Sequence, residues 1–186
     1  MKNKNRMKIK CKCNVKRKKM LLNLTKEELN YIAGFIDGDG CILAQIVKRN
    51  DYKLKFQIRV SITFYQKTSR HWFLFQLHKK LCLGSLRKRN DGMSELNIVG
   101  FTPVKQLLIV LLPYLIIKKP IANLILQIID KLENLDKLDK LDIVNIRSNF
   151  IEVCELVDKV AEFTDSKKRI INTIFVKKFW YSMNMS

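Results

Sequence analysis

The sequence lacks any run of eighteen apolar residues, any C-x-x-C pair, and an apolar segment at its N-terminus. A transmembrane helix and a secretory signal are therefore not expected, and we predict a soluble protein with no membrane partner. Five cysteines, an odd number without paired spacing, indicate reduced thiols in a reducing compartment. With 186 residues, the chain is long enough for one domain with a substantial core.

Acidic residues are also scarce, at 17 Asp and Glu against 36 Lys and Arg, so the net charge is +19. This excess predicts a polyanionic partner. Residues 1–20 hold ten basic residues and no acidic one, and we expect a disordered arm that either contacts nucleic acid or stays solvated. Residues 21–186, the expected domain, keep 26 basic residues against 17 acidic ones and are basic as well.

The stretch Tyr31–Gly40 joins an apolar helix to two carboxylates. Thr25 and Glu28 have the spacing of a capping box and predict a helix from about Lys26 to Gly38. Nearly two turns of this helix contain only apolar or small residues, so the helix has no polar face and should be buried on every side. Such burial requires a partner.

The partner is most simply the same helix of a second chain, because the sequence contains no second copy of this stretch. Gly34 and Gly38, four residues apart, form a shallow strip where two helix backbones can approach closely. We therefore predict a homodimer whose interface includes Tyr31, Gly34, Phe35 and Gly38.

Asp37 and Asp39 lie at the carboxyl end of the predicted helix, where the free carbonyl groups already make a carboxylate unfavourable. Pairing two such ends in a dimer increases the local negative charge. A hard divalent cation would compensate this charge, with the Asp39 carboxylate and the Gly38 carbonyl as the predicted ligands. On spacing alone, the Asp-Gly-Asp-Gly sequence is equally well a turn after a helix.

Residues Ile32–Gly40 read IAGFIDGDG and resemble the LAGLIDADG signature of homing endonucleases, with six of nine positions identical. The likeness runs from about Thr25 to Lys168 and is greatest toward the single-motif, homodimeric members encoded in organelle group I introns. Further matching stretches, in order, are Ala44–Ile46, Gln66–Thr68, Trp72–Leu74, Lys118 with Ala122 and Asn123, Val157–Asp158, and Asp165–Lys167.

The resemblance implies an α/β fold of order αββαββα, with an antiparallel saddle-shaped sheet and extra C-terminal helices. It implies a site-specific endonuclease that makes a staggered double-strand break in a long pseudo-palindromic DNA target and so promotes homing of its intron. The implied location is an organelle, with the chloroplast favoured over the mitochondrion. The alternatives are an RNA-binding maturase, although family maturases usually carry two motifs, and a noncatalytic DNA-binding repressor.

The resemblance also implies a catalytic set of Asp39, Gln66, Arg70 and Lys118. Two or three Mg²⁺ ions per dimer, replaceable by Mn²⁺, would bridge the scissile phosphates, while the last three side chains position solvent and stabilise charge. Taken alone, each of these three side chains resembles an ordinary surface residue. No His, Cys or Tyr stands out as a general base, and both histidines, His71 and His78, are expected to be structural, which favours a metal-bound hydroxide as the nucleophile.

Two strands are predicted at Ile42–Arg49 and Lys53–Tyr65, with Asn50 and Asp51 in the turn between them. The second strand alternates polar and apolar residues without exception, so one face should pack on the core and the other should meet solvent or a partner. The open face is rich in cations, amides and hydroxyls, the groups that contact phosphates and base edges.

A second hairpin is predicted at Leu86–Arg89 and Glu95–Val99. Arg87 and Arg89 are candidates for bidentate guanine contacts, and Glu95 could orient both. The complete predicted DNA-binding set is Gln45, Arg49, Tyr52, Lys53, Lys55, Gln57, Arg59, Ser61, Thr63, Arg87, Arg89, Glu95 and Asn97.

The other predicted helices are Arg70–Leu81, Thr102–Leu112, Lys119–Leu132, Ser148–Phe163 and Ser166–Tyr181. In the first of them, Trp72, Phe73, Leu77 and Leu81 are expected in the core. Residues 133–147 include a repeat of Leu, Asp and Lys that departs from the family pattern and predicts a surface insertion. Residues 148–181 form the C-terminal helices, whose basic side chains either grip phosphates or belong to a plain amphipathic helix.

Overall fold

The computed structural model describes residues 24–135, 143–164 and 170–184. Its elements are α2 (Lys26–Asp39), β1 (Gly40–Lys48), β2 (Phe56–Lys67), a 3-10 turn (Thr68–Arg70), α3 (His71–Leu81), β3 (Ser85–Lys88), β4 (Met93–Val99), α4 (Phe101–Leu111), α5 (Lys119–Leu135), α6 (Ile143–Glu162) and α7 (Thr173–Asn184). The expected order αββαββα is confirmed from α2 to α4. The predicted N-terminal arm, most of the Leu-Asp-Lys repeat, and the cations of residues 167–169 lie outside the described residues.

Helix α2 begins at the predicted capping box. The backbone N–H of Glu28 donates to Thr25 Oγ1 at 3.3 Å, and the N–H of Thr25 donates to Glu28 Oε2 at 3.1 Å. The helix buries Ile32, Ala33 and Ile36 against its own chain, together with Leu29. On its other face Tyr31, Gly34 and Gly38 are not covered by the described residues, so the expected all-round burial is met on one side only within the described part of one chain.

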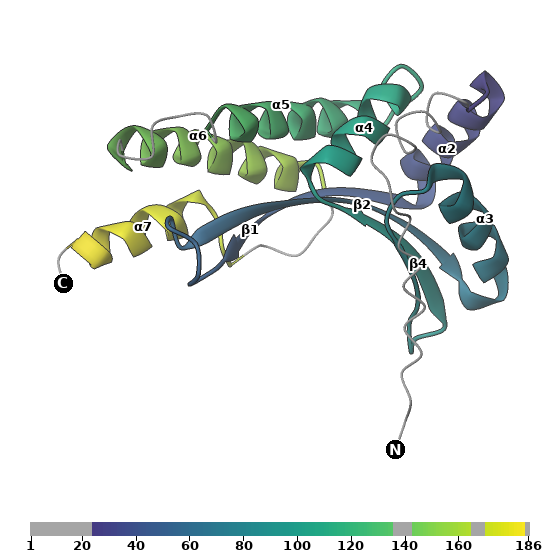
Figure 1. The fold of residues 1–186 in the computed structure, drawn as a ribbon, viewed down its shortest axis with the longest axis horizontal. Coiled ribbons are helices and arrows are strands. Elements are labelled where there is room, and N and C mark those ends of the chain that lie inside the picture. Colours follow the sequence, from purple (N-terminus) through teal and green to yellow (C-terminus); the bar gives the residue numbers. More distant parts are fainter. Residues whose placement is uncertain (1–23, 136–142, 165–169, 185–186) are drawn as a thin grey trace.

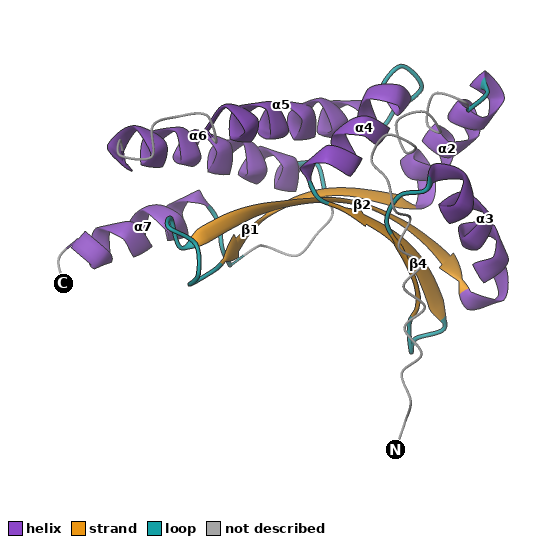
Figure 2. Cartoon of the chain, in the orientation of Figure 1, coloured by secondary structure: helices purple, strands orange, loops and turns teal. Residues whose placement is uncertain are grey.

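The sheet has the strand order β1-β2-β4-β3, and every neighbouring pair is antiparallel. Figures 1 and 2 show that the sheet is arched, with α4, α5 and α6 over its convex side. Its concave side is not covered by any of these helices. The expected antiparallel saddle is therefore confirmed, and the described helices α4, α5 and α6 leave one broad face of it uncovered.

Strand β2 keeps the predicted alternation but begins three residues later than expected. Its even-numbered residues from Phe56 to Phe64 are buried, as predicted. The prediction that Lys53 and Lys55 lie on this strand is wrong, because residues 49–55 form a closed loop. The N–H of Arg49 donates to the carbonyl of Lys55 at 2.8 Å, and Lys55 has a φ of 63°, which an extended strand does not allow.

Helix α3 turns a different face to the core than predicted. Trp72 is 60% exposed, so its assignment to the core is wrong. The buried stripe is instead Leu74, Leu77, His78 and Leu81, which are spaced at three and four residues as one helix face requires. Trp72 lies two residues before that stripe begins, and two residues correspond to more than half a helical turn.

The C-terminal helices start elsewhere than the sequence indicated, with α6 beginning at Ile143 and α7 at Thr173. Helix α7 packs on the far end of the β1–β2 hairpin. The Trp180 indole N–H donates to the carbonyl of Leu54 at 2.9 Å, and the Phe56 ring meets Phe175, Phe179 and Trp180 edge-on. This aromatic cluster anchors the end of the hairpin that is distant from α2.

Candidate active site and nucleic-acid interface

The two carboxylates at the end of α2 have different environments. Asp37 accepts hydrogen bonds from three successive backbone N–H groups, those of Ile116 at 2.8 Å, Ile117 at 3.2 Å and Lys118 at 2.9 Å. These bonds fix the turn that leads into α5. Asp37 is therefore a structural cap, and its oxygens are already occupied.

Lys118 caps the same helix end from the other side. Its ammonium group donates to the carbonyls of Ile36 at 2.7 Å and Asp37 at 2.6 Å. A cation at this position offsets the partial negative charge at a helix C-terminus. Lys118 thus contacts the backbone two residues before Asp39, as its predicted place around the metals requires. It also stabilises the end of α2, a structural role that was not predicted.

Asp39 is exposed, and among the described residues no hydrogen bond or ion pair engages its carboxylate. Gly38 is exposed as well, with open space where a side chain would lie. A carboxylate and a neighbouring backbone carbonyl are hard oxygen donors that fit Mg²⁺. The donor set is incomplete in one chain, because the described residues contain no group of three or more His, Cys, Asp or Glu that could hold a metal. Further ligands would have to come from a second chain and from phosphate oxygens.

Gln66 and Arg70 lie at the same end of the sheet as α2. The register pairs Gly40 with Phe64, which places Gln66 just beyond the start of β1. Arg70 is exposed at the end of the 3-10 turn, and its Nη1 donates to Gln66 Oε1 at 3.4 Å. The structure therefore brings two of the predicted catalytic residues into contact and places the other two at the neighbouring helix end.

Both histidines are engaged by the fold, in line with their expected structural role. His78 is buried in α3, and the ring Nδ1 of His71 lies 3.0 Å from Ser94 Oγ. Burial lowers the pKa of His71, helped by the nearby charge of Lys88. A His71 ring that avoids its charged form is suited to a fixed hydrogen bond rather than to a surface cation.

The concave face of β2 presents Gln57, Arg59 and Ser61, as predicted. Cross-strand pairing places Gln45 of β1 directly beside Arg59. Thr63 is buried instead of open, and its hydroxyl donates to Asn97 Oδ1 at 3.2 Å. Thr63 and Asn97 thus form a hydrogen bond with each other across the β2–β4 pair. These two side chains are therefore less available to a partner than Gln57, Arg59 and Ser61.

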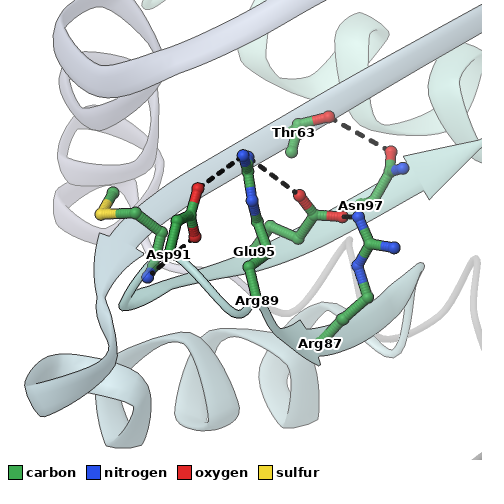
Figure 3. Close-up of polar contacts among 7 residues, drawn as sticks. Thr63, Arg87, Arg89, Asp91, Glu95 and Asn97 are labelled. Carbon is green, nitrogen blue, oxygen red and sulfur yellow. Dashed lines mark hydrogen bonds and ion pairs between the residues drawn. The ribbon is translucent and has the colours of Figure 1, made fainter.

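The β3–β4 hairpin carries a connected set of charges, drawn in Figure 3. Glu95 is 7% exposed and holds Arg87 through a contact of 2.8 Å and Arg89 through one of 3.7 Å. Arg89 also contacts Asp91 at 2.7 Å. Glu95 thus contacts both arginines, as an orienting role requires, while that role and the reading of guanine remain predictions.

The remaining predicted DNA contacts, Arg49, Tyr52, Lys53 and Lys55, lie on or beside the loop at the far end of the hairpin. Arg49 donates twice to Asp51, at 3.0 and 2.8 Å, and this pair lowers the pKa of Asp51 to about 2. The Lys55 ammonium donates to the carbonyl of Asn50 at 3.0 Å. These side chains therefore belong to the tip of the interface and not to its face.

Comparison with known proteins agrees with this geometry. Residues 32–129 match the sequence profile described as LAGLIDADG endonuclease. The DNA endonuclease I-CvuI of Chlorella vulgaris is 50% identical over 141 residues, which cover 76% of this chain and 82% of that protein. The DNA endonuclease I-CreI of Chlamydomonas reinhardtii is 39% identical over 144 residues, or 77% of this chain and 83% of that protein. The chain belongs to the LAGLIDADG endonuclease family.

Solved structures extend the match to three dimensions. The structure superposes on the homing endonuclease I-CvuI, crystallised with the I-CreI target in 2 mM Mg with its DNA uncleaved, with a TM-score of 0.77 and 44% identity. The match covers 86% of this chain and 96% of that one. The predicted family is thus confirmed. Within the described residues of this LAGLIDADG protein, no helix is long and apolar enough to cross a membrane.

Sequence reasoning missed part of the apolar surface beside the LAGLIDADG helix. Ile116 and Ile117 are 82% and 72% exposed, and Tyr31 on α2 is 61% exposed. The two isoleucines lie next to the helix end, since their N–H groups bind Asp37. Consecutive exposed isoleucines in a short link between two helices were the signal that could have extended the predicted dimer surface.

Proposed function

We propose that this chain is a site-specific homing endonuclease that acts as a homodimer and makes a staggered double-strand break in a long pseudo-palindromic DNA target. The observation that carries the proposal is the free Asp39 carboxylate at the end of the family's signature helix, at one end of an open polar sheet face. Both curated relatives are DNA endonucleases, which supports the same activity here.

Asp39 and the carbonyl of Gly38 would hold Mg²⁺, or Mn²⁺ in its place, with two or three ions per dimer. When bound, such ions neutralise the charge of the scissile phosphate and lower the pKa of coordinated water. Gln66 and Arg70, held together at 3.4 Å, would orient solvent and stabilise developing negative charge. Lys118 positions the carbonyl-bearing end of α2 through its two hydrogen bonds, and it would add a positive charge beside the scissile phosphate.

The dimer would form through the open face of α2. Among the described residues of one chain, nothing lies within 4 Å of a Cβ added at Gly34 or Gly38, so this strip has room for a second helix. Tyr31 and Phe35 flank it, and Phe35 is backed by Phe64 and Phe73 at ring distances of 5.7 and 5.3 Å. A two-fold axis along this strip would bring the two Asp39 residues toward each other, and with them the donors that one chain lacks.

The concave sheet face would lie along the major groove, where all four base pairs can be distinguished. The twelve residues of β2, at about 3.3 Å each, span about 40 Å, or roughly 9 to 12 base pairs. Two protomers would therefore cover about 18 to 24 base pairs. The biological setting that we propose is homing of an organelle intron, with the chloroplast favoured.

Cleavage of the intronless form of the gene in which this reading frame lies is the direct test. The purified protein is incubated with that DNA over Mg²⁺ concentrations that start at 2 mM and go higher, because the I-CvuI complex held uncleaved DNA at 2 mM Mg. Double-strand breaks at one site, absent without the metal, are expected. Binding of the precursor intron RNA with no DNA cleavage at any Mg²⁺ concentration would instead favour the maturase.

A further inference from the structure

Three apolar side chains lie on the concave face of the sheet, among the polar groups proposed to meet DNA. Leu43 and Val47 are half-buried residues of β1, and Val99 ends β4 with 47% of its surface exposed. The residues that alternate with Leu43 and Val47 along β1 are fully in the core: Ile42, Ala44 and Ile46. Since successive side chains of a strand point to opposite faces, Leu43 and Val47 point to the concave side.

The strand register confirms this placement. Leu43 pairs with Ser61, and Ser61 pairs in turn with Val99, so one row across three strands reads apolar, hydroxyl, apolar. Val47 pairs with Gln57 in a second row nearer the hairpin tip. Directly opposed residues project to the same side of a sheet. The apolar groups therefore stand beside the side chains that were predicted to read bases.

These three side chains are not part of the hydrophobic core. Among the described residues, neither Leu43 nor Val47 belongs to the buried cluster or to the half-buried apolar residues packed against it. Single exposed apolar residues are common on protein surfaces and usually need no explanation. Here, however, Leu43 and Val47 flank Gln45 on β1, and their neighbours on this face of β2, Gln57, Arg59 and Ser61, are all polar.

The major groove offers one apolar feature, the C5-methyl group of thymine, and apolar side chains recognise it by contact. We propose that Leu43 and Val47 read thymine methyl groups, so that part of the target is specified by van der Waals contact. This inference rests on the proposed function. Leu43 and Val47 are about 13 Å apart along β1, which corresponds to about four base pairs. Between them lie Gln45 and Arg59, which face each other across β1 and β2 and would read base edges by hydrogen bonds.

A methyl-specific experiment tests the inference without altering the protein. Cleavable duplexes are selected by the wild-type protein from two randomised pools of about 24 base pairs, one made with thymine and one with uracil. The most enriched thymine duplex is then resynthesised with each thymine replaced singly by uracil. At two positions about four base pairs apart in each half-site, binding should weaken about fourfold, the factor equivalent to about 0.8 kcal/mol per buried methyl. Preferences for guanine should be the same in both pools.

Protein variants assign the sensitive positions. Val47→Asn replaces the apolar side chain by an amide without a methyl group, so the difference between thymine and uracil should vanish at the outer position and persist at the inner one. Leu43→Asn should do the reverse. Ile109→Asn is the control, because Ile109 is 56% exposed on α4, in the helical layer. It should leave both positions sensitive.

The possible results separate cleanly. If the thymine duplex is cut and bound equally well with uracil at every position, the inference is wrong and the endonuclease proposal stands. If sensitivity exists but Val47→Asn and Leu43→Asn leave it unchanged, other residues read the methyls and the inference is wrong as well. If no duplex is selected from the thymine pool, the proposed function fails and the inference falls with it.

Discussion

The end of α2 and the β3–β4 hairpin share one arrangement with the charges reversed. In each, one charged group is bound within the chain and a second charged group nearby is exposed. At the helix end, Asp37 and Lys118 are bound to the backbone of their own chain, and no other described residue engages the anion Asp39. At the hairpin, the carboxylate of Glu95 is buried, and the cation Arg87 is presented with 67% of its side chain exposed.

The difference matches the two tasks that we propose. A metal requires free carboxylate oxygen, whereas a phosphate or a guanine edge requires free N–H donors. In each region an inner charge, bound within the chain (Asp37 and Lys118, or Glu95), fixes the geometry. An outer charge, exposed at the surface (Asp39, or Arg87), is available to a partner. Replacing an outer charge should therefore change function and spare the fold, whereas replacing an inner one should change stability first.

The largest effect is expected from Asp39→Asn, which removes the charge of the free carboxylate and keeps its size. Cleavage of the selected duplex should fall by about 10²–10³-fold or more, because a charge that acts on the transition state is lost. Binding of the same duplex, measured by gel shift, should change little, since Asp39 is not a recognition contact. Rapid Mg²⁺-dependent cutting by this variant would show that the catalytic carboxylate lies elsewhere.

Gly34→Leu tests whether two α2 ends meet at all, which the metal site requires. The variant should sediment as a monomer or aggregate, and it should not cut DNA. Gly34→Ala is the matched control for folding, because an added Cβ at this position meets nothing within 4 Å in one chain. A wild-type protein that is monomeric without DNA in light scattering would remove the basis of the proposed interface.

Asp37→Asn removes an inner charge and should act on stability. The amide keeps one acceptor oxygen for the three N–H groups of residues 116–118, so a loss of about 1–3 kcal/mol in the free energy of unfolding is expected. Urea titration measures it. Under conditions where the variant is folded, cleavage should be closer to wild type than that of Asp39→Asn, and the reverse ranking would contradict the division into inner and outer charges.

Arg87→Ala removes the outer charge of the hairpin. Binding should weaken by about 1–3 kcal/mol at one or two guanine positions of each half-site, with preference for guanine relaxed there. Lys88→Ala is the matched control, since the exposed neighbour should weaken binding to all sequences alike. A uniform loss of activity in Arg87→Ala, without relaxed preference at any position, would make Arg87 a phosphate contact.

Sequence patterns predicted what depends on neighbours along the chain. The capping box at Thr25, the alternation of β2 and the signature at the end of α2 each involve residues a few positions apart, and the structure contains all three features. The resemblance supplied the catalytic set, and the structure places its members at one end of the sheet. Their catalytic roles remain predictions.

The features that the sequence could not show depend on groups far apart in the chain. Asp37 binds the backbone 79 to 81 residues away, and nothing near Asp37 indicated this. Strand β1 is apolar at almost every position, so no alternation marked Leu43 as concave and Ile42 as buried. Trp72 was assigned to the core by residue type, although helix geometry turns it outward.

The smallest expected effect concerns His71, whose ring contacts the strand next to the one that carries Gln66. Ser94 pairs with Gln66 in the sheet, donates to Thr68 Oγ1 and lies against the His71 ring. Burial lowers the pKa of His71 from its usual 6.5, so the unfolded chain binds a proton at higher pH than the folded one. Stability from this group is thus fully present above about pH 6.5 and is lost as the pH falls through the folded pKa.

Thermal unfolding followed at pH 7 and at about pH 5 measures this contribution, and His71→Gln should lose less stability over that interval than the wild type. The carboxylates and lysines are the same in both proteins, so their titration cancels in the comparison. Cleavage by His71→Gln at pH 7 should stay within a few-fold of wild type, because the ring supports a strand and touches no reacting group. An equal pH dependence in the two proteins would show that His71 is not the group whose protonation weakens this side of the sheet.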